Sequence, residues 1–98
     1  MKQKEITLLK KRQYALEMLE SRGMSQNLSD TVKLMHSPSV RSRMLAELQQ
    51  CLIRIVKGCD YLLEHESKDD LLPTQLDIMT EYAAILDARM YALPPGVQ

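Results

Sequence analysis

Apolar residues recur at intervals of three and four positions in two stretches of this sequence. The first stretch has them at Leu45, Leu48, Leu52, Ile55, Cys59 and Leu62, and the second at Leu76, Met79, Ala83, Leu86, Met90 and Leu93. Such spacing gathers the side chains of each stretch on one face of an α-helix. It predicts helices over about 38–65 and 75–93, and the connection of about ten residues lets them pack antiparallel as a hairpin.

A further helix is predicted over about 4–22, because Gly23 follows it and glycine commonly ends helices. We expect its apolar stripe to lie across the groove of the hairpin, which gives a bundle of three main helices. The residues of this stripe are Leu9, Leu16 and Leu19, flanked by Leu8 and Ala15.

A short helix is predicted over about 28–36, where the residues at helical spacing are Leu28, Val32 and Met35. The starts of the two long helices can also be read from capping residues. Ser37 and Pro38 are expected to cap and open the helix over 38–65, since proline is favoured in a first turn. Thr74, followed three residues later by Asp77, is expected to cap the last helix.

The aromatic content favours an all-α fold. The 98 residues include four tyrosines and neither phenylalanine nor tryptophan, so the core must consist mainly of aliphatic side chains and methionine. β-Sheets usually draw on aromatic residues, whereas this composition favours helix-on-helix packing. We therefore predict one all-α domain over 1–98, a small helical bundle in which residues 94–98 form a disordered tail.

The sequence contains no pattern of catalytic residues. It lacks a Gly-rich phosphate loop, a nucleophile elbow, and the His-x-x-x-His or Cys-x-x-Cys spacing of metal sites. Its two histidines, His36 and His65, are isolated and fall at predicted helix ends. We therefore expect no enzyme activity, no small-molecule substrate, no metal and no cofactor. The chain also lacks a signal-peptide pattern and an apolar run of the roughly 18 residues that cross a bilayer, so we expect a cytoplasmic protein without a membrane partner.

Charge is unevenly distributed along the chain although the total is zero. Residues 1–57 contain 11 Lys and Arg against 5 Asp and Glu, a net +6, whereas residues 58–98 contain 2 against 8, a net −6. Such asymmetry is typical of a basic binding face or an acidic tail. It is equally typical of two halves that attract each other, within one chain or across a dimer.

A second apolar row on the last helix is the clearest candidate for function. Ile78, Tyr82 and Ile85 lie beside the core stripe, and Tyr91 follows near the end of the helix. A helix that is apolar over such a wide arc either sits centrally in the fold or has a partner on its second face. We therefore predict a non-enzymatic protein–protein interaction module, an adaptor, chaperone or regulator, that binds through these four residues and self-associates, with a homodimer favoured.

The alternative is a DNA-binding regulator that uses residues 28–45. The short helix, the turn at Ser37-Pro38-Ser39 and the following helix have helix-turn-helix order, with Arg41 and Arg43 in the N-terminal turns where recognition residues contact bases. Lys33 would contact phosphates. The zero net charge and the length of the second helix count against this hypothesis.

Overall fold

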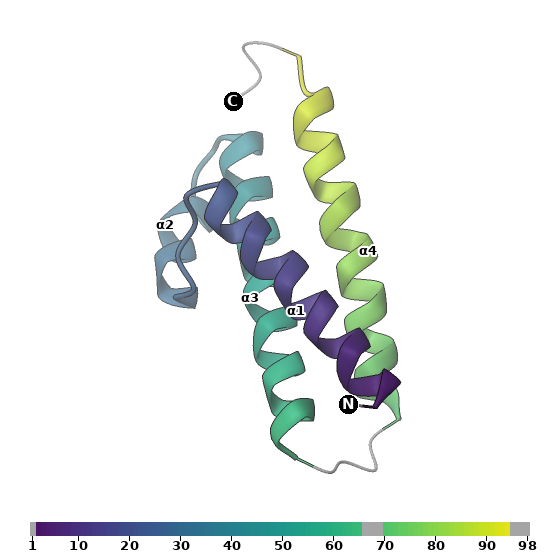
Figure 1. The fold of residues 1–98 in the computed structure, drawn as a ribbon. Coiled ribbons are helices and arrows are strands. Elements are labelled where there is room, and N and C mark those ends of the chain that lie inside the picture. Colours follow the sequence, from purple (N-terminus) through teal and green to yellow (C-terminus); the bar gives the residue numbers. More distant parts are fainter. Residues whose placement is uncertain (1, 66–69, 95–98) are drawn as a thin grey trace.

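The structure is a bundle of helices without strands in its described part. The computed structural model describes residues 2–65 and 70–94. The elements, in chain order, are α1 (Gln3–Ser21), the 3₁₀ helix η1 (Leu28–Thr31), α2 (Val32–Met35), α3 (Val40–Glu64) and α4 (Leu71–Ala92) (Figure 1). The predicted all-α bundle is confirmed. Residues 95–98 of the predicted disordered tail lie outside the described residues.

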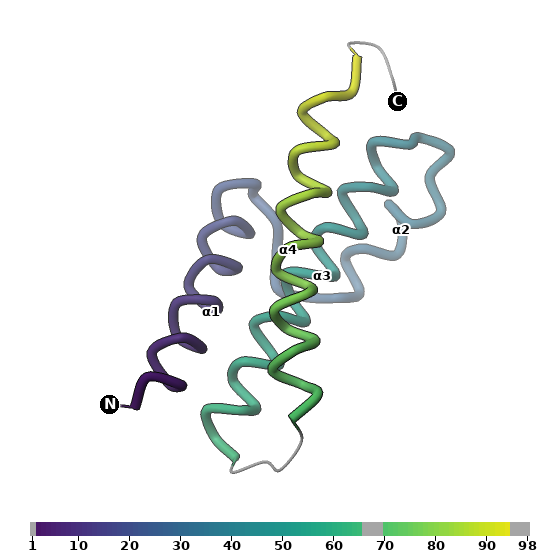
Figure 2. Tube along the Cα trace, turned by 90° about the vertical axis from the view of Figure 1, so that its right-hand side faces the viewer, coloured from purple at the N-terminus to yellow at the C-terminus, as the bar shows by residue number. Residues whose placement is uncertain are grey.

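α3 is the central helix of the bundle. α1 and α4 each pack along it, and η1 and α2 cover its N-terminal half. α3 and α4 run antiparallel, as the hairpin prediction requires, and Figure 2 shows α1 on the far side of α3–α4 from α2. α1 packs chiefly on α3, and its Lys11 and Arg22 side chains reach carboxylates of α4.

The predicted stripes form most of the core. Thirteen side chains make one buried cluster, which takes in the centres of both long stripes: Leu8, Ala15, Leu19, Leu48, Cys51, Leu52, Ile53, Ile55, Val56, Cys59, Leu76, Ala83 and Leu86. The stripe of α1 was predicted one position out of register at its start, because Leu8 is buried whereas Leu9 is 39% exposed. In the short helical segment Thr31 is buried and the expected Val32 and Met35 are exposed, because a 3₁₀ turn over Leu28–Thr31 changes which side faces α3.

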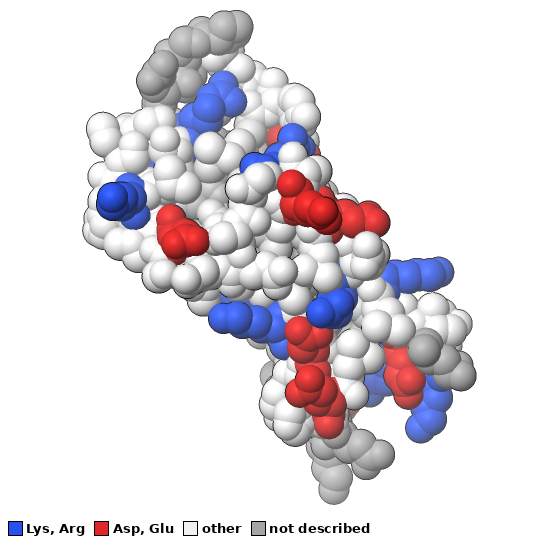
Figure 3. Space-filling view, turned by 60° about the vertical axis from the view of Figure 1, so that its left-hand side comes forward, with Lys and Arg blue, Asp and Glu red and all other residues white. Residues whose placement is uncertain are grey.

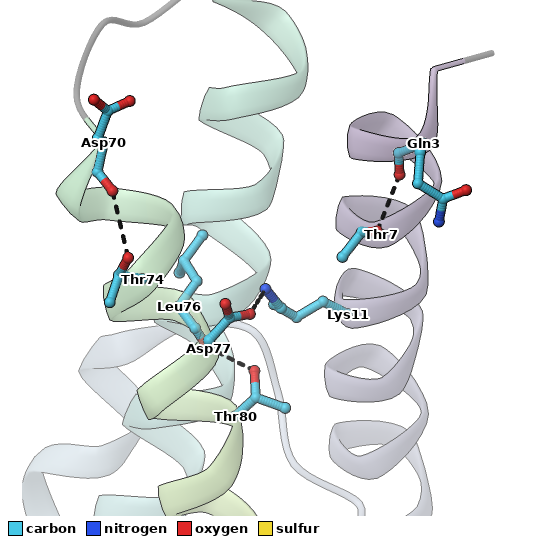
Figure 4. Close-up of polar contacts among 8 residues, drawn as sticks. All are labelled: Gln3, Thr7, Lys11, Asp70, Thr74, Leu76, Asp77 and Thr80. Atoms are coloured by element: carbon cyan, nitrogen blue, oxygen red, sulfur yellow. Dashed lines mark hydrogen bonds and ion pairs between the residues drawn. The ribbon is translucent and has the colours of Figure 1, made fainter.

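The basic and acidic halves of the sequence pair within the chain. Three ion pairs join cations of α1 to carboxylates of α3 and α4: Arg12 with Asp60 at 2.5 Å, Lys11 with Asp77, and Arg22 with Asp87. On the face drawn in Figure 3, acidic and basic side chains lie interspersed and form no continuous stripe of one sign. Figure 4 shows Lys11 of α1 reaching across to Asp77 of α4. At these three points, the basic half (residues 1–57) and the acidic half (residues 58–98) therefore bind each other within a single chain.

Two helices begin at residues other than those predicted. α3 begins after Ser39, whose hydroxyl accepts a hydrogen bond from the backbone N–H of Ser42 at 3.1 Å. Pro38 therefore lies outside the helix. α4 begins at Leu71, four residues before the predicted start, because Pro73 falls in the first turn, where a missing N–H leaves no helical bond unmade. Thr74 is consequently inside α4 and donates its hydroxyl to the carbonyl of Asp70 instead of capping (Figure 4).

Two glycines have a structural role, one at the end of α1 and one where α3 contacts α4. Gly23 ends α1 with a φ of 65°, and its N–H bonds the carbonyl of Glu20 at 3.0 Å, which confirms it as the predicted helix stop. Gly58, in the interior of α3, faces Leu76 of α4. A Cβ at this position would lie 2.6 Å from the Leu76 Cδ2 atom, so any other residue here would force the Leu76 side chain to shift.

Candidate functional site

α4 carries two apolar rows, and only one of them is buried. The core row packs on α3 through Leu76, Ala83 and Leu86. The second row remains on the surface, where Ile78 is 61% exposed, Tyr82 39% and Ile85 56%. Ile78 and Ile85 are seven residues apart, so they lie on the same side of the helix about 10 Å from each other. The predicted row is therefore present as a continuous exposed strip along α4.

A groove runs beside this row between α2, α3 and α4. Its volume is about 410 Å³. The apolar part of its lining comes from all three helices and consists of Met35, Cys51, Met79 and Tyr82. The polar part comes from α3 and consists of Arg43, Glu47, Gln50 and Arg54. We call the groove together with Ile78 and Ile85 the groove face.

Tyr82 is held in place at the edge of the groove. Its hydroxyl donates a hydrogen bond to the carboxylate of Glu47 on α3. This bond raises the pKa of Tyr82 above its usual value, since ionisation of the phenol would place two negative charges side by side. The bond fixes the ring at the point where α3 and α4 meet. It also occupies the one carboxylate that lines the groove.

Cys51 closes the bottom of the groove from α3. Its thiol is buried and donates to the backbone carbonyl of Met79 at 3.2 Å. Burial raises the pKa of Cys51, with the nearby Arg54 opposing the effect. A thiol in this state is a weak nucleophile, so Cys51 contributes an apolar surface here.

Cations dominate the rim of the groove face. Arg43 and Arg54 line the groove, and Lys57 follows Arg54 by one turn on the same side of α3. Arg89 lies one turn beyond Ile85 on α4, close enough to Tyr82 to influence its pKa. All four side chains are on exposed residues, and within residues 2–65 and 70–94 none of them forms an ion pair.

Two of the three carboxylates of α4 lie on the side of the helix that faces α1, and the third, Glu81, is exposed within one turn of both Ile78 and Ile85. Asp77 and Asp87 both point toward α1, where Lys11 and Arg22 bind them. One side of α4 therefore carries two carboxylates that α1 neutralises, and the other side carries the apolar row, with Arg89 and Glu81 beside it.

Tyr91 belongs to a different surface from the other three predicted residues. The guanidinium of Arg22 lies 5.0 Å from the centre of its ring and donates a hydrogen bond to its hydroxyl at 3.0 Å. Tyr91 therefore packs on the α1 side of α4, beside a cavity of about 250 Å³ that Arg22, Arg41 and Asp87 also line. The structure brings Ile78, Tyr82 and Ile85 together and places Tyr91 apart from them.

The residues of the DNA-binding hypothesis do not form one reading surface. Arg41 donates to the carbonyl of Met90, at the C-terminal end of α4, at 3.3 Å. Arg43 lies on the groove rim, because two residues along a helix turn by about 200°. Lys33 is exposed on α2. DNA binding through residues 28–45 stays a prediction. It is less favoured because Arg41 is half-buried and already bonded to α4.

Sequence reasoning missed the contributions of α2 and α3 to the groove. The row on α3 that includes Arg43, Glu47, Gln50 and Arg54 has the spacing of four, three and four that marks one helix face. That spacing could have been recognised as a polar strip. Its position beside the Ile78 row depends on how α3 and α4 are rotated against each other, which spacing alone does not define.

Neither a metal-binding cluster nor a membrane-spanning helix is found in the part of the chain that the structure describes. There, no three His, Cys, Asp or Glu side chains come together in a way that could hold a metal ion. No described helix combines the length and apolar character that crossing a membrane requires. Comparison of the chain with protein-family models, curated proteins and solved structures gave no significant match.

Proposed function

We propose that this chain is a non-catalytic protein-binding module, an adaptor, chaperone or regulator, whose binding surface is the groove face. The observation that carries the proposal is the exposure of Ile78 and Ile85 on an ordered helix whose other side already packs on the core. Apolar strips of this kind, bordered by polar side chains, are typical of protein interaction sites. Burying one such side chain is worth about 1.5–3 kcal/mol, so covering the row stabilises a complex substantially.

The occupant we propose is another protein instead of a second copy of this chain. A two-fold dimer through the groove face would set this patch against its own copy, so that two rims with more cations than carboxylates would meet. Like charges set against each other across an interface are unfavourable and suppress the wrong pairing. Self-association through this face is therefore the competing outcome of the test.

The test compares Ile78→Asp with Ala88→Asp, which introduces the same charge at an exposed position of α4 that is outside the apolar row, on the side of Ile85 opposite Tyr82. Tagged wild-type chain and both variants are cross-linked in the cells that produce the protein, and the recovered proteins are quantified. We expect Ala88→Asp to recover the same partner as wild type. Ile78→Asp should lose it by about 100-fold, since placing a charge in an apolar contact costs about 3 kcal/mol or more.

Two results would contradict the proposal. One is equal recovery by Ile78→Asp and Ala88→Asp. The other is a purified chain that sediments as a stable dimer and dissociates on Ile78→Asp, which would make a second copy the occupant. Circular dichroism of both variants checks that the fold is retained, because Ile78 is exposed and its replacement opens no cavity.

A further inference from the structure

The groove face combines an apolar floor with a rim on which four cations outnumber two carboxylates, Glu47 and Glu81. Its floor includes Met35 and Met79, and its rim cations have no carboxylate partner among the described residues. Building on the proposed function, we infer that the segment bound there is an amphipathic α-helix with acidic residues flanking its apolar face. The inference names the partner's chemistry, which the exposed row alone does not define.

The shape of the face suits a helix. α3 and α4 pack side by side, and the groove lies between them with α2 at one end. A third helix placed in the groove of a helix pair completes a bundle, which is a common way for peptides to bind helical proteins. The distance from Ile78 to Ile85, two turns or about 10 Å, matches partner anchors at positions i, i+3 or i+4, and i+7.

Methionine at two points of the floor adds to this fit. Met35 comes from α2 and Met79 from α4. Their unbranched side chains adapt to different shapes, so they accommodate leucine, isoleucine or phenylalanine anchors of a partner helix. Tyr82, which also lines the groove, is held by Glu47 and supplies a rigid aromatic surface.

The positive charge of the rim favours a partner helix that has acidic residues on both sides of its apolar face. Glu47 and Glu81 offset only part of the rim charge, because the rim has four cations, none of which forms an ion pair with a described residue. Arg43, Arg54 and Lys57 on one side and Arg89 on the other can therefore meet carboxylates on both flanks of a bound helix. Long cationic side chains reach such carboxylates while their stems cover apolar surface. Exposed pairs contribute modestly to affinity but strongly to choice of partner and to the association rate.

The experiment uses two labelled peptides of about 18 residues, long enough to span about 27 Å as a helix. Both carry leucines at the same heptad positions, with glutamates flanking the leucines in one peptide and lysines in the other. Each is titrated with the full chain by fluorescence anisotropy at low and at physiological salt. We expect the glutamate peptide to bind at least about tenfold more tightly at low salt, and this advantage to shrink as salt screens the rim. Bound peptide should gain helical circular dichroism.

Matched variants locate the effect. Arg54→Glu reverses a charge on the rim, and Lys10→Glu makes the same change at an exposed position of α1. We expect Arg54→Glu to remove most of the preference for the glutamate peptide, and Lys10→Glu to retain it. Ile78→Asp should abolish binding of both peptides.

The outcomes separate this inference from the proposed function. Equal binding of the two peptides, with both dependent on Ile78, overturns acidic selection and leaves the proposed function standing. The inference is also wrong if Arg54→Glu and Lys10→Glu change the preference for the glutamate peptide equally. It is wrong again if the peptide binds without becoming more helical. If neither peptide binds while recovery of the cellular partner still depends on Ile78, the inference fails alone. If recovery of the cellular partner does not depend on Ile78, both the proposed function and this inference are wrong.

Discussion

Replacing Gly58 by alanine tests how closely α3 and α4 approach each other. Two effects oppose one another at this position. Alanine is favoured over glycine inside a helix by about 1 kcal/mol. The added Cβ, however, would lie 2.6 Å from the Cδ2 atom of Leu76, whose residue is only 1% exposed. Overpacking a core in this way costs about 1–3 kcal/mol, since buried side chains have little room to move.

The steric cost should exceed the gain in helix propensity. We expect Gly58→Ala to lower the free energy of unfolding by about 1 kcal/mol, the difference between a cost of about 2 and a gain of about 1. For a domain of this size, that loss lowers the melting temperature by about 4–8 °C. Urea denaturation followed by far-UV circular dichroism measures the change, provided that the urea dependence stays the same in both proteins.

The matched background is Leu76→Ala, which removes the three atoms that a Cβ at Gly58 would contact. Leu76→Ala alone should lower the free energy of unfolding by about 2–5 kcal/mol, because it leaves a cavity in the core. In that background Gly58→Ala should instead stabilise the protein by about 1 kcal/mol, since only the propensity effect remains. The sign of one substitution thus reverses, and the two sites are coupled by about 2 kcal/mol.

The reasoning would be refuted by a stabilising Gly58→Ala in the wild-type chain. In that case α3 and α4 would have room for a methyl group, and Gly58 would have no packing role. A loss of equal size in both backgrounds would place the cause elsewhere, because the contact with Leu76 would then make no difference.

Three further substitutions or titrations probe other parts of the structure. Ser39→Ala should lower the free energy of unfolding by about 1 kcal/mol, because it removes the N-cap of α3. Thr74→Ala should lower it much less, because Thr74 is inside α4 and does not cap it. Urea denaturation of the two variants measures the difference. The thiols of Cys51 and Cys59 should react with a disulfide reagent only slowly in the folded protein and rapidly in denaturant, since burial raises the pKa of both. The hydrogen bond to Glu47 favours neutral Tyr82, so the raised pKa of Tyr82 contributes stability that is complete below the unfolded pKa of about 10 and is lost as pH rises through the folded pKa. Tyr82→Phe should therefore weaken the alkaline dependence of stability, measured by denaturation at several pH values.

The hairpin could be predicted because its signal is long and periodic. Six apolar residues in each stretch leave one arrangement in which both stripes are buried, and α3 and α4 adopt it. Helix starts were harder to predict, because several residues near each start can cap. Thr74 and Ser37 have suitable side chains, yet Pro73 fits within the first turn of α4 and Ser39 is the residue that caps α3. Local capping preferences differ by too little to choose among neighbours.

The candidate site was predictable only in part. An exposed Ile78 and Ile85 follow from two apolar rows on one helix, since a helix packed at the edge of a bundle buries only one side. The position of Tyr91 was not available from that argument, because its place beside Arg22 depends on where α1 lies. The contact between Tyr82 and Glu47 likewise depends on the rotation of α4 against α3.

The docking of α1 explains how a neutral chain can present a basic binding face. Net charge counts every residue, whereas a partner meets only one side of the molecule. The cations Lys11 and Arg22 neutralise Asp77 and Asp87 on one side of α4, and the carboxylates left near the groove, Glu47 and Glu81, are fewer than the four cations of the rim. Zero net charge counts against binding to DNA, whose phosphates attract a basic protein surface. Because α1 binds two of the three acids of α4, that argument does not extend to an acidic helix in the groove, and the charge on each side of α4 is the better guide.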